Sequence, residues 1–211
     1  MRDPREEIIA VTHALDDAGM VPNKSGNVSC RVEDGFAITP AGIPYRELIT
    51  SHIVTLPLAA SEAATEPRPS SEWRMHAAIY RARPDVCAIV HTHSPRATAL
   101  AAAGRGIPPF HYMIALVGGD VRCTPYATFG TAELAESAVR GLQGRRACLL
   151  GNHGVMAIGS TLARAHAVAV EVENLADEYL SMLSAGLVPQ LLDDAEIQKV
   201  VALFADYGRL G

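Results

Sequence analysis

Apolar positions along the chain repeat with two different periods, which predicts alternating helices and strands. Ile8, Val11 and Leu15 recur at helical spacing behind Asp3-Pro4, so we expect a helix that starts near residue 4 and ends before Gly19. The same reasoning predicts five more helices: from Ser70 or Ser71 to before Pro84, from Pro95 to Gly104, from Thr131 to near Gly144, from Ser160 to about Ala185, and from Asp193 to Tyr207.

Short apolar runs between turn residues predict the strands. Residues 23–31 and 35–40 flank Asp34-Gly35, a hairpin signal, and residues 147–150 and 154–158 flank a second short turn. Residues 86–90 form a continuous apolar run that is typical of a buried strand. Neighbouring strands indicate hairpins while helices alternate with them, so we expect an α/β fold. The expected architecture is a single domain over 1–211, a three-layer α/β/α sandwich with a mixed or antiparallel central sheet.

Composition narrows the class of protein. Of 211 residues, 49% are hydrophobic and 19% are charged, which excludes a disordered chain. The net charge of −5 and the lack of a basic stripe argue against a nucleic-acid partner. No run of 18 apolar residues and no signal-peptide core occur, so we expect no membrane partner and a cytoplasmic location. The four cysteines are scattered without a CxxC pair, as expected of small buried side chains.

The strongest chemical signal is His91-Thr92-His93, directly after the buried strand. Residues i and i+2 of a strand share one face, so the two imidazoles converge as metal ligands do. The alternative is a pair of solvated histidines at a strand end. His153 lies in the turn bounded by Gly151 and Gly154 and offers a third imidazole. Three histidines with an open position are typical of a catalytic zinc site.

A second signal is an anion site where a helix starts. Ser70-Ser71-Glu72 precedes a helical pattern, and N–H groups at a helix start favour phosphate. An ordinary helix cap is the alternative. Two glycine-containing loops, Gly26-Asn27 and Ala41-Gly42, have little side chain to screen their N–H groups from a phosphate.

Taken together, these motifs resemble the class II aldolase/adducin family, in particular its members that act on L-fuculose 1-phosphate. The resemblance spans nearly the whole chain in order, through Gly-Asn-Val-Ser at 26–29, Ile-Thr-Pro at 38–40, Gly-Ile-Pro-Tyr at 42–45, Ser-Ser-Glu-Trp-Arg at 70–74, the His91/His93 pair, His-Tyr-Met-Ile-Ala at 111–115, Pro-Tyr-Ala-Thr-Phe-Gly at 125–130, His-Gly at 153–154 and Tyr-Gly at 207–208. There are departures. The family often has threonine at Ala41 and Gln-His at Gly151-Asn152, and its loop after Gly119 is about one residue longer.

The resemblance implies a full set of site residues. One Zn²⁺ per subunit would be held by His91, His93 and His153, with Glu72 as a fourth ligand when substrate is absent. Phosphate would be bound by Gly26, Asn27, Ala41, Gly42, Ser70 and Ser71. Tyr112 would reach the site of a neighbouring subunit in a homotetramer. Phe129 and the C-terminal Tyr207 would shape the aldehyde end.

The implied reaction is a reversible cleavage of L-fuculose 1-phosphate to dihydroxyacetone phosphate and L-lactaldehyde. It would pass through a zinc-stabilised enediolate, with Glu72 moving a proton and Tyr112 donating one to the aldehyde oxygen. Only Lys24 and Lys199 exist as lysines, both in polar or terminal contexts, which disfavours a Schiff base.

The alternatives within the fold are a 5-deoxyribulose 1-phosphate aldolase, a pentulose-phosphate 4-epimerase and a methylthioribulose-phosphate dehydratase. An adducin-type structural protein lacks the metal ligands that this chain has.

Overall fold

A single seven-stranded sheet organises the protein, which we describe from a computed structural model that covers residues 3–207, with side chains to residue 204. The strand order is β3-β2-β1-β4-β7-β6-β5, and every pair is antiparallel except the parallel pair β5–β6. The mixed sheet agrees with the sequence prediction. The strands are β1 (Asn27–Val32), β2 (Gly35–Ile38), β3 (Val54–Pro57), β4 (Ala88–Thr92), β5 (Arg122–Thr124), β6 (Ala147–Leu150) and β7 (Gly154–Gly159).

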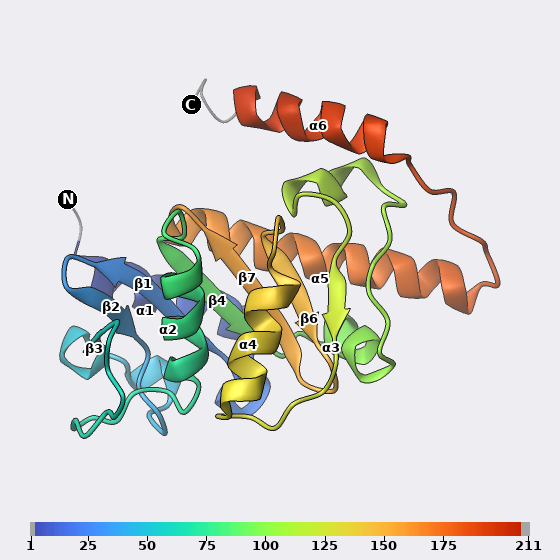
Figure 1. Ribbon diagram of the computed structural model, residues 1–211. Helices are drawn as coiled ribbons and strands as arrows, with labels where there is room; N and C mark the ends of the chain where they lie inside the picture. The colour runs from blue at the N-terminus through green and yellow to red at the C-terminus, as the bar shows by residue number, and fades with distance from the viewer. Residues whose placement is uncertain (1–2, 208–211) are drawn as a thin grey trace.

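Helices cover both faces of this sheet and complete the three layers (Figure 1). One face carries α2 (Trp73–Ala82) and α4 (Ala132–Gly141), which pack on each other. The other carries α1 (Pro4–Asp17), α3 (Pro95–Ala102) and α5 (Leu162–Ser184). The last helix, α6 (Asp194–Tyr207), packs on the 3₁₀ helix η4 (Tyr112–Leu116). Shorter 3₁₀ helices are η1 (Pro22–Lys24), η2 (Tyr45–Glu47) and η3 (Thr50–His52).

Two apolar cores lie on the two faces of the sheet. Side chains alternate along β1, so Val28 and Cys30 join the core beneath α1, whereas Asn27 and Ser29 face α2. Burying one large apolar side chain contributes about 1.5–3 kcal/mol to stability, and each core has many of them. The polar residues on the α2 face of β1 are therefore an exception in an otherwise apolar interior. None of the helices within the described range is long and apolar enough to cross a membrane.

The two edge strands were not predicted from the sequence. They are β3 and β5, with 4 and 3 residues, and they close opposite ends of the sheet. Runs this short carry too little alternation to separate a strand from a loop.

The start of α2 also differs from the prediction that Ser70 or Ser71 caps it. The helix begins at Trp73, and Glu72 occupies the N-cap position with φ −97° and ψ 10° and no side-chain cap hydrogen bond. Its carboxylate turns toward the histidines instead, and Ser71 and Glu72 form a turn before the helix.

Candidate active site

The end of β4 and the β6–β7 turn bring three imidazoles together. His91 lies within β4, opposite Met156 of β7, and His93 follows β4 directly. His153 lies in the turn that leads into β7. Ring centroids are 4.9 Å apart in each of the three pairs, and one ligand atom from each residue lies within 4.8 Å of the others. The geometry expected for the His-x-His motif is therefore present, with its third member from a distant turn.

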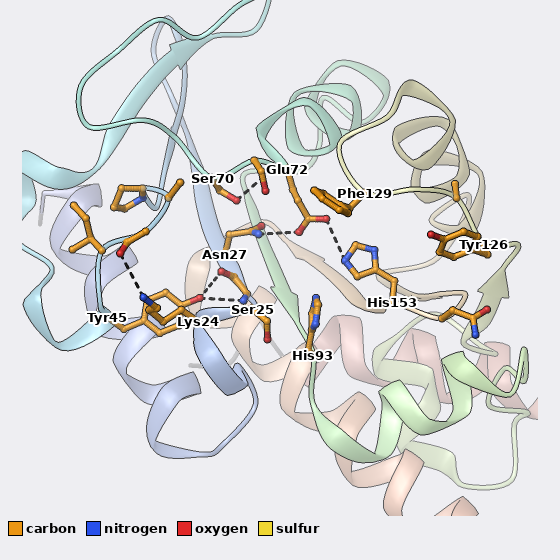
Figure 2. Close-up of a pocket in the computed structure, with 18 residues that line it drawn as sticks. Lys24, Ser25, Asn27, Tyr45, Ser70, Glu72, His93, Tyr126, Phe129 and His153 are labelled. Atoms are coloured by element: carbon orange, nitrogen blue, oxygen red, sulfur yellow. Dashed lines mark hydrogen bonds and ion pairs between the residues drawn. The ribbon is translucent and has the colours of Figure 1, made fainter.

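Glu72 faces this cluster from the start of α2. Its Oε2 atom lies 3.0 Å from His91 Nε2, and its Oε1 atom lies 3.2 Å from His153 Nε2. Asn27 donates from Nδ2 to Oε2 at 3.1 Å, and both the Glu72–Asn27 and Glu72–His153 contacts are drawn in Figure 2. Glu72 is only 7% exposed, and His91 is fully buried. A carboxylate and three imidazoles thus converge on one small space.

The hydrogen bonding of this cluster fits a bound cation. His91 Nδ1 lies 2.8 Å from the carbonyl oxygen of Val155, which accepts the Nδ1 proton and leaves the Nε2 lone pair free. That lone pair faces Glu72 Oε2 and, at 3.1 Å, His93 Nε2. Glu72 Oε1 is buried and accepts no hydrogen bond from the described residues. Electron-rich atoms at such separations require a proton or a metal ion between them.

The spacing fits a metal ion as well. Ligand atoms about 2.1 Å from a tetrahedral ion are about 3.4 Å apart. The three contacts of 3.0, 3.1 and 3.2 Å among these atoms are a few tenths of an ångström shorter. His91, His93, His153 and Glu72 therefore suit a divalent metal with little movement.

Burial sets the charge of these groups. It lowers the pKa of His93 to about 3 and that of His153 to about 4, with repulsion from His91 adding to the effect. Burial also raises the pKa of Glu72, but attraction and hydrogen bonding from His91 outweigh it and leave that pKa below its usual value. Burial lowers the pKa of His91, but attraction to Glu72 outweighs it and raises that pKa, so without a metal a proton on Nε2 of His91 takes the place of the cation. At neutral pH, His93 and His153 are neutral and Glu72 is ionised, which are the forms that bind metals.

A cavity of about 410 Å³ opens beside the cluster (Figure 2). It holds every predicted phosphate residue as well as Phe129, which is 67% exposed. The lining residues are Lys24, Ser25, Gly26, Asn27, Pro40, Ala41, Gly42, Ile43, Tyr45, Ser70, Ser71, Glu72, His93, Tyr126, Ala127, Phe129, Asn152 and His153. Histidines and Glu72 lie at one part of the cavity, and small residues of three loops lie at another.

Two of the predicted loop N–H groups already have partners in the chain. Gly26 donates to the Tyr45 hydroxyl at 3.1 Å, and Ala41 donates to the carbonyl of Arg68 at 2.8 Å. Gly26 itself is required, because an added Cβ would lie 2.6 Å from the carbonyl oxygen of His91. These two residues therefore let a ligand come close to the backbone, but their N–H groups are not free to donate to it.

Several residues that line the cavity were not predicted from the sequence. Lys24 is the one lining residue with a permanent positive charge, and its Nζ donates to the carbonyl of Gly42 at 3.5 Å. Tyr45, Tyr126 and Asn152 also line the cavity. Three of these four residues stand inside or next to motifs shared with the family: Tyr45, Tyr126 and Asn152. Their position in those motifs could have identified them as site residues. In the sequence, Lys24 stands out only as one of the two lysines that could form a Schiff base.

Of the two remaining predicted residues, Tyr112 is described and does not line this cavity. Tyr112 lies on η4, 52% exposed, with ring centroids 4.9 Å from His111 and 6.4 Å from Phe204. The backbone of α6 extends to Tyr207, but the side chain of Tyr207 lies outside the described residues.

The fold and this site define a family. The family described as Class II Aldolase and Adducin N-terminal domain matches residues 6–180, and the chain belongs to it. It is a class II aldolase, a lyase, and such aldolases depend on a metal ion.

Individual relatives are similar over almost the whole chain. A 5-methylthioribulose-1-phosphate/5-deoxyribulose-1-phosphate aldolase of Rhodospirillum rubrum is 45% identical, with 95% of this chain and 93% of that protein covered. The L-fuculose phosphate aldolase of Escherichia coli K12 is 43% identical, with 96% and 94% covered. A solved structure of an L-fuculose 1-phosphate aldolase has a TM-score of 0.92 and 38% identity, with 97% of each chain covered.

Proposed function

We propose that this protein cleaves a deoxyketose 1-phosphate reversibly to dihydroxyacetone phosphate and a short aldehyde, with Zn²⁺ as its metal. The observation that carries the proposal is the convergence of three imidazoles and a buried carboxylate beside a cavity lined by small residues and Lys24. One part of that cavity suits a metal ion, and another suits a phosphate.

In this proposal His91, His93 and His153 hold the metal. When bound, the metal supplies a Lewis acid that neutralises negative charge developing on the oxygens of the cleaved ketose. The second ring nitrogen of His91 is fixed by the carbonyl of Val155, which keeps Nε2 aimed at the site. Three protein ligands leave a coordination position for substrate once Glu72 moves aside.

Glu72 is the proposed acid/base residue. Ionised and only 7% exposed, it can accept a proton from the carbon of dihydroxyacetone phosphate in the condensation direction, and it returns that proton to the same carbon after cleavage. Its position at the N-cap of α2, outside the helix proper, allows the side chain to change direction without breaking helical hydrogen bonds. Proton transfer at a fixed carbon requires a carboxylate whose direction is controlled.

The proposed phosphate site comprises Ser70, Ser71, Gly42, Gly26, Asn27 and Ala41. Gly42 has φ +81° and no atom within 4 Å of where a Cβ would be, which leaves room for a phosphate oxygen. Lys24, donating to the carbonyl of Gly42, brings a positive charge to the same loop. We add Lys24 to this set, because Ala41 lacks the hydroxyl that the family often has there.

The aldehyde end is proposed to be completed by a second subunit. Tyr112 is half exposed and lies outside the cavity of its own chain, which suits a residue that acts in a neighbouring subunit of a homotetramer. Phe129 lines the cavity mouth, and Tyr207 follows on α6, which packs against η4. Tyr112 is proposed to donate a proton to the aldehyde oxygen in condensation and to take it back from that oxygen in cleavage.

L-Fuculose 1-phosphate is the first substrate we propose, and it would yield L-lactaldehyde. The name of the Rhodospirillum rubrum relative favours 5-deoxyribulose 1-phosphate as a second. Both sugars end in a methyl group. An apolar terminus suits the aromatic rings of Phe129 and Tyr126 at the cavity.

A coupled assay for dihydroxyacetone phosphate tests the proposal. Purified protein with Zn²⁺ should release it from at least one of these two ketose 1-phosphates. A 4-epimerase would instead convert one pentulose phosphate into another without release, and a dehydratase would give a dehydrated product. Either result would overturn the proposal.

Matched variants tie the activity to the site. His91→Ala should lose bound metal and turnover, whereas His52→Ala, a histidine on η3, should retain both. Glu72→Gln should keep most of the metal and lose about 10²–10⁴-fold in kcat. Full turnover by Glu72→Gln would remove Glu72 from the mechanism.

A further inference from the structure

A line of buried polar side chains runs from Glu72 into the interior between α2 and β1. Glu72 at the N-cap of α2 and His76 and Tyr80 on that helix follow one another at intervals of four, and Asn27 and Ser29 are two apart on β1. Four helical residues advance about 6.0 Å and two strand residues about 6.6 Å. The helical row and the strand row therefore have nearly equal spacing, so side chains from the helix and the strand alternate along the line.

Every neighbouring pair in this line is hydrogen-bonded. Asn27 Nδ2 lies 3.1 Å from Glu72 Oε2, and Asn27 Oδ1 lies 2.5 Å from His76 Nε2. Ser29 Oγ lies 2.6 Å from His76 Nδ1 and 2.8 Å from the Tyr80 hydroxyl. His76 and Ser29 are fully buried, and the other three are at most 7% exposed. This is a continuous polar chain inside an apolar core.

The ionised carboxylate fixes the direction of these bonds. Glu72 only accepts, so Asn27 must turn its NH₂ toward Glu72 and its carbonyl toward His76. His76 must then donate from Nε2, and as a neutral ring it accepts at Nδ1 from Ser29, whose oxygen accepts from Tyr80. Complete burial lowers the pKa of His76 to about 3, in agreement with a neutral ring.

We propose that His76 is a positioning residue that acts through Asn27 to set the direction of the Glu72 carboxylate at the metal site. The proposal rests on the role of Glu72 stated above. A flipped Asn27 amide would set its carbonyl oxygen against the carboxylate and its NH₂ against the His76 donor. The carboxylate makes that orientation unfavourable at one end and the His76 N–H makes it unfavourable at the other, and the hydrogen bond from Ser29 to Nδ1 holds the ring in place.

Two changes at position 76 test this. His76→Leu removes the donor to Asn27, whereas the amide of His76→Gln reaches the place of Nε2 and can donate in its stead. We expect His76→Leu to lower kcat about 10–100-fold with KM changed less than twofold, and His76→Gln to recover much of the loss. Metal content should be unchanged in both, since His76 contacts no proposed ligand nitrogen.

Ser29→Ala extends the test without changing the ring. It removes the hydrogen bond that His76 accepts at Nδ1 and so loosens the ring that orients Asn27, so kcat should fall while metal content stays constant. The matched control is Thr12→Val, which deletes another buried hydroxyl hydrogen bond, from Thr12 to the carbonyl of Ile8 on α1. The control should lose stability but keep kcat.

A measurement on metal-free wild-type protein is independent of turnover. ¹H–¹⁵N correlation spectra of the imidazoles should show His76 as the neutral Nε2–H tautomer between pH 6 and 8. An Nδ1–H tautomer would overturn the proposal, and so would normal kcat in folded, metal-loaded His76→Leu or Ser29→Ala. If wild-type protein cleaves no ketose 1-phosphate, the proposed function fails instead, and the spectra still decide the direction of the chain.

Discussion

Gly154 packs closely against Thr92, His93 and His91, so the size of its side chain affects where the metal ligands lie. Gly154→Ala therefore disturbs the metal site directly. A Cβ there would lie 2.4 Å from the carbonyl oxygen of Thr92, 3.0 Å from His93 Cδ2 and 3.4 Å from His91 Cε1. Real Cβ atoms essentially never come within 3.0 Å, so β4 and β7 must move apart by about 0.6 Å. The register that pairs Thr92 with Val155 would be strained at the metal site.

Two effects of different size follow. Overpacking of this kind costs about 1–3 kcal/mol of stability. Metal ligands tolerate only about 0.2 Å of displacement, so a shift near 0.6 Å should weaken metal binding by tenfold or more. We expect Gly154→Ala to fold, to bind Zn²⁺ much more weakly, and to recover activity only at raised metal concentration.

Urea unfolding of the metal-free protein measures the first effect, and competition with a chelating dye measures the second. The control is Gly144→Ala, which has φ +66° and open space around the added Cβ. It should cost about 1–2 kcal/mol from backbone strain alone and leave metal affinity unchanged. A folded Gly154→Ala protein with wild-type metal affinity would refute the argument that backbone contact sets the ligand geometry.

Four further outcomes are expected. Dialysis against a chelator should abolish cleavage and lower Tm, and Zn²⁺ at 100 times its Kd should restore activity and about 2.7 kcal/mol of stability; activity without metal would contradict this. Lys24→Met should raise KM for a ketose 1-phosphate, with kcat nearly constant, and an unchanged KM would remove Lys24 from the phosphate site. The pKa of His76 near 3 lies below the unfolded value near 6.5, so His76 should contribute about 2 kcal/mol to the stability that metal-free protein loses between pH 6.5 and pH 5, beside the contributions of His93 and His153; urea unfolding of His76→Gln should show a loss smaller by that amount. Mixed subunits of Tyr112→Phe and Glu72→Gln, each inactive alone, should regain some activity, and none would be regained if Tyr112 acts within its own subunit.

Much of the architecture was predictable from local pattern. The helical repeat of Ile8, Val11 and Leu15 matches α1, and the hairpin signal at Asp34-Gly35 matches the β1–β2 turn. Such patterns are local because helix and strand periods involve residues only a few positions apart. The short edge strands β3 and β5, and the true start of α2, lacked a local signal of this kind.

The His-x-His pair was also a local signal, because two residues of one strand share a face whatever else the chain does. No local signal indicates that His153 lies close to that pair. It follows from the pairing of β4 with β7, which sets the turn at His153 beside the end of β4. Sequence could propose the third ligand through resemblance, but strand pairing was needed to bring it within reach.

His76 shows most clearly what only the tertiary structure decided. In the sequence it lies one helical turn beyond Glu72, and nothing ties it to Asn27 or Ser29, 49 and 47 residues away. Its row at intervals of four and the row at intervals of two on β1 were both visible in the sequence. Whether side chains of the two rows form hydrogen bonds depends on how α2 lies across β1. Residues far apart in sequence can bond only when packing turns the right faces of the helix and the strand toward each other and aligns the two elements along their lengths.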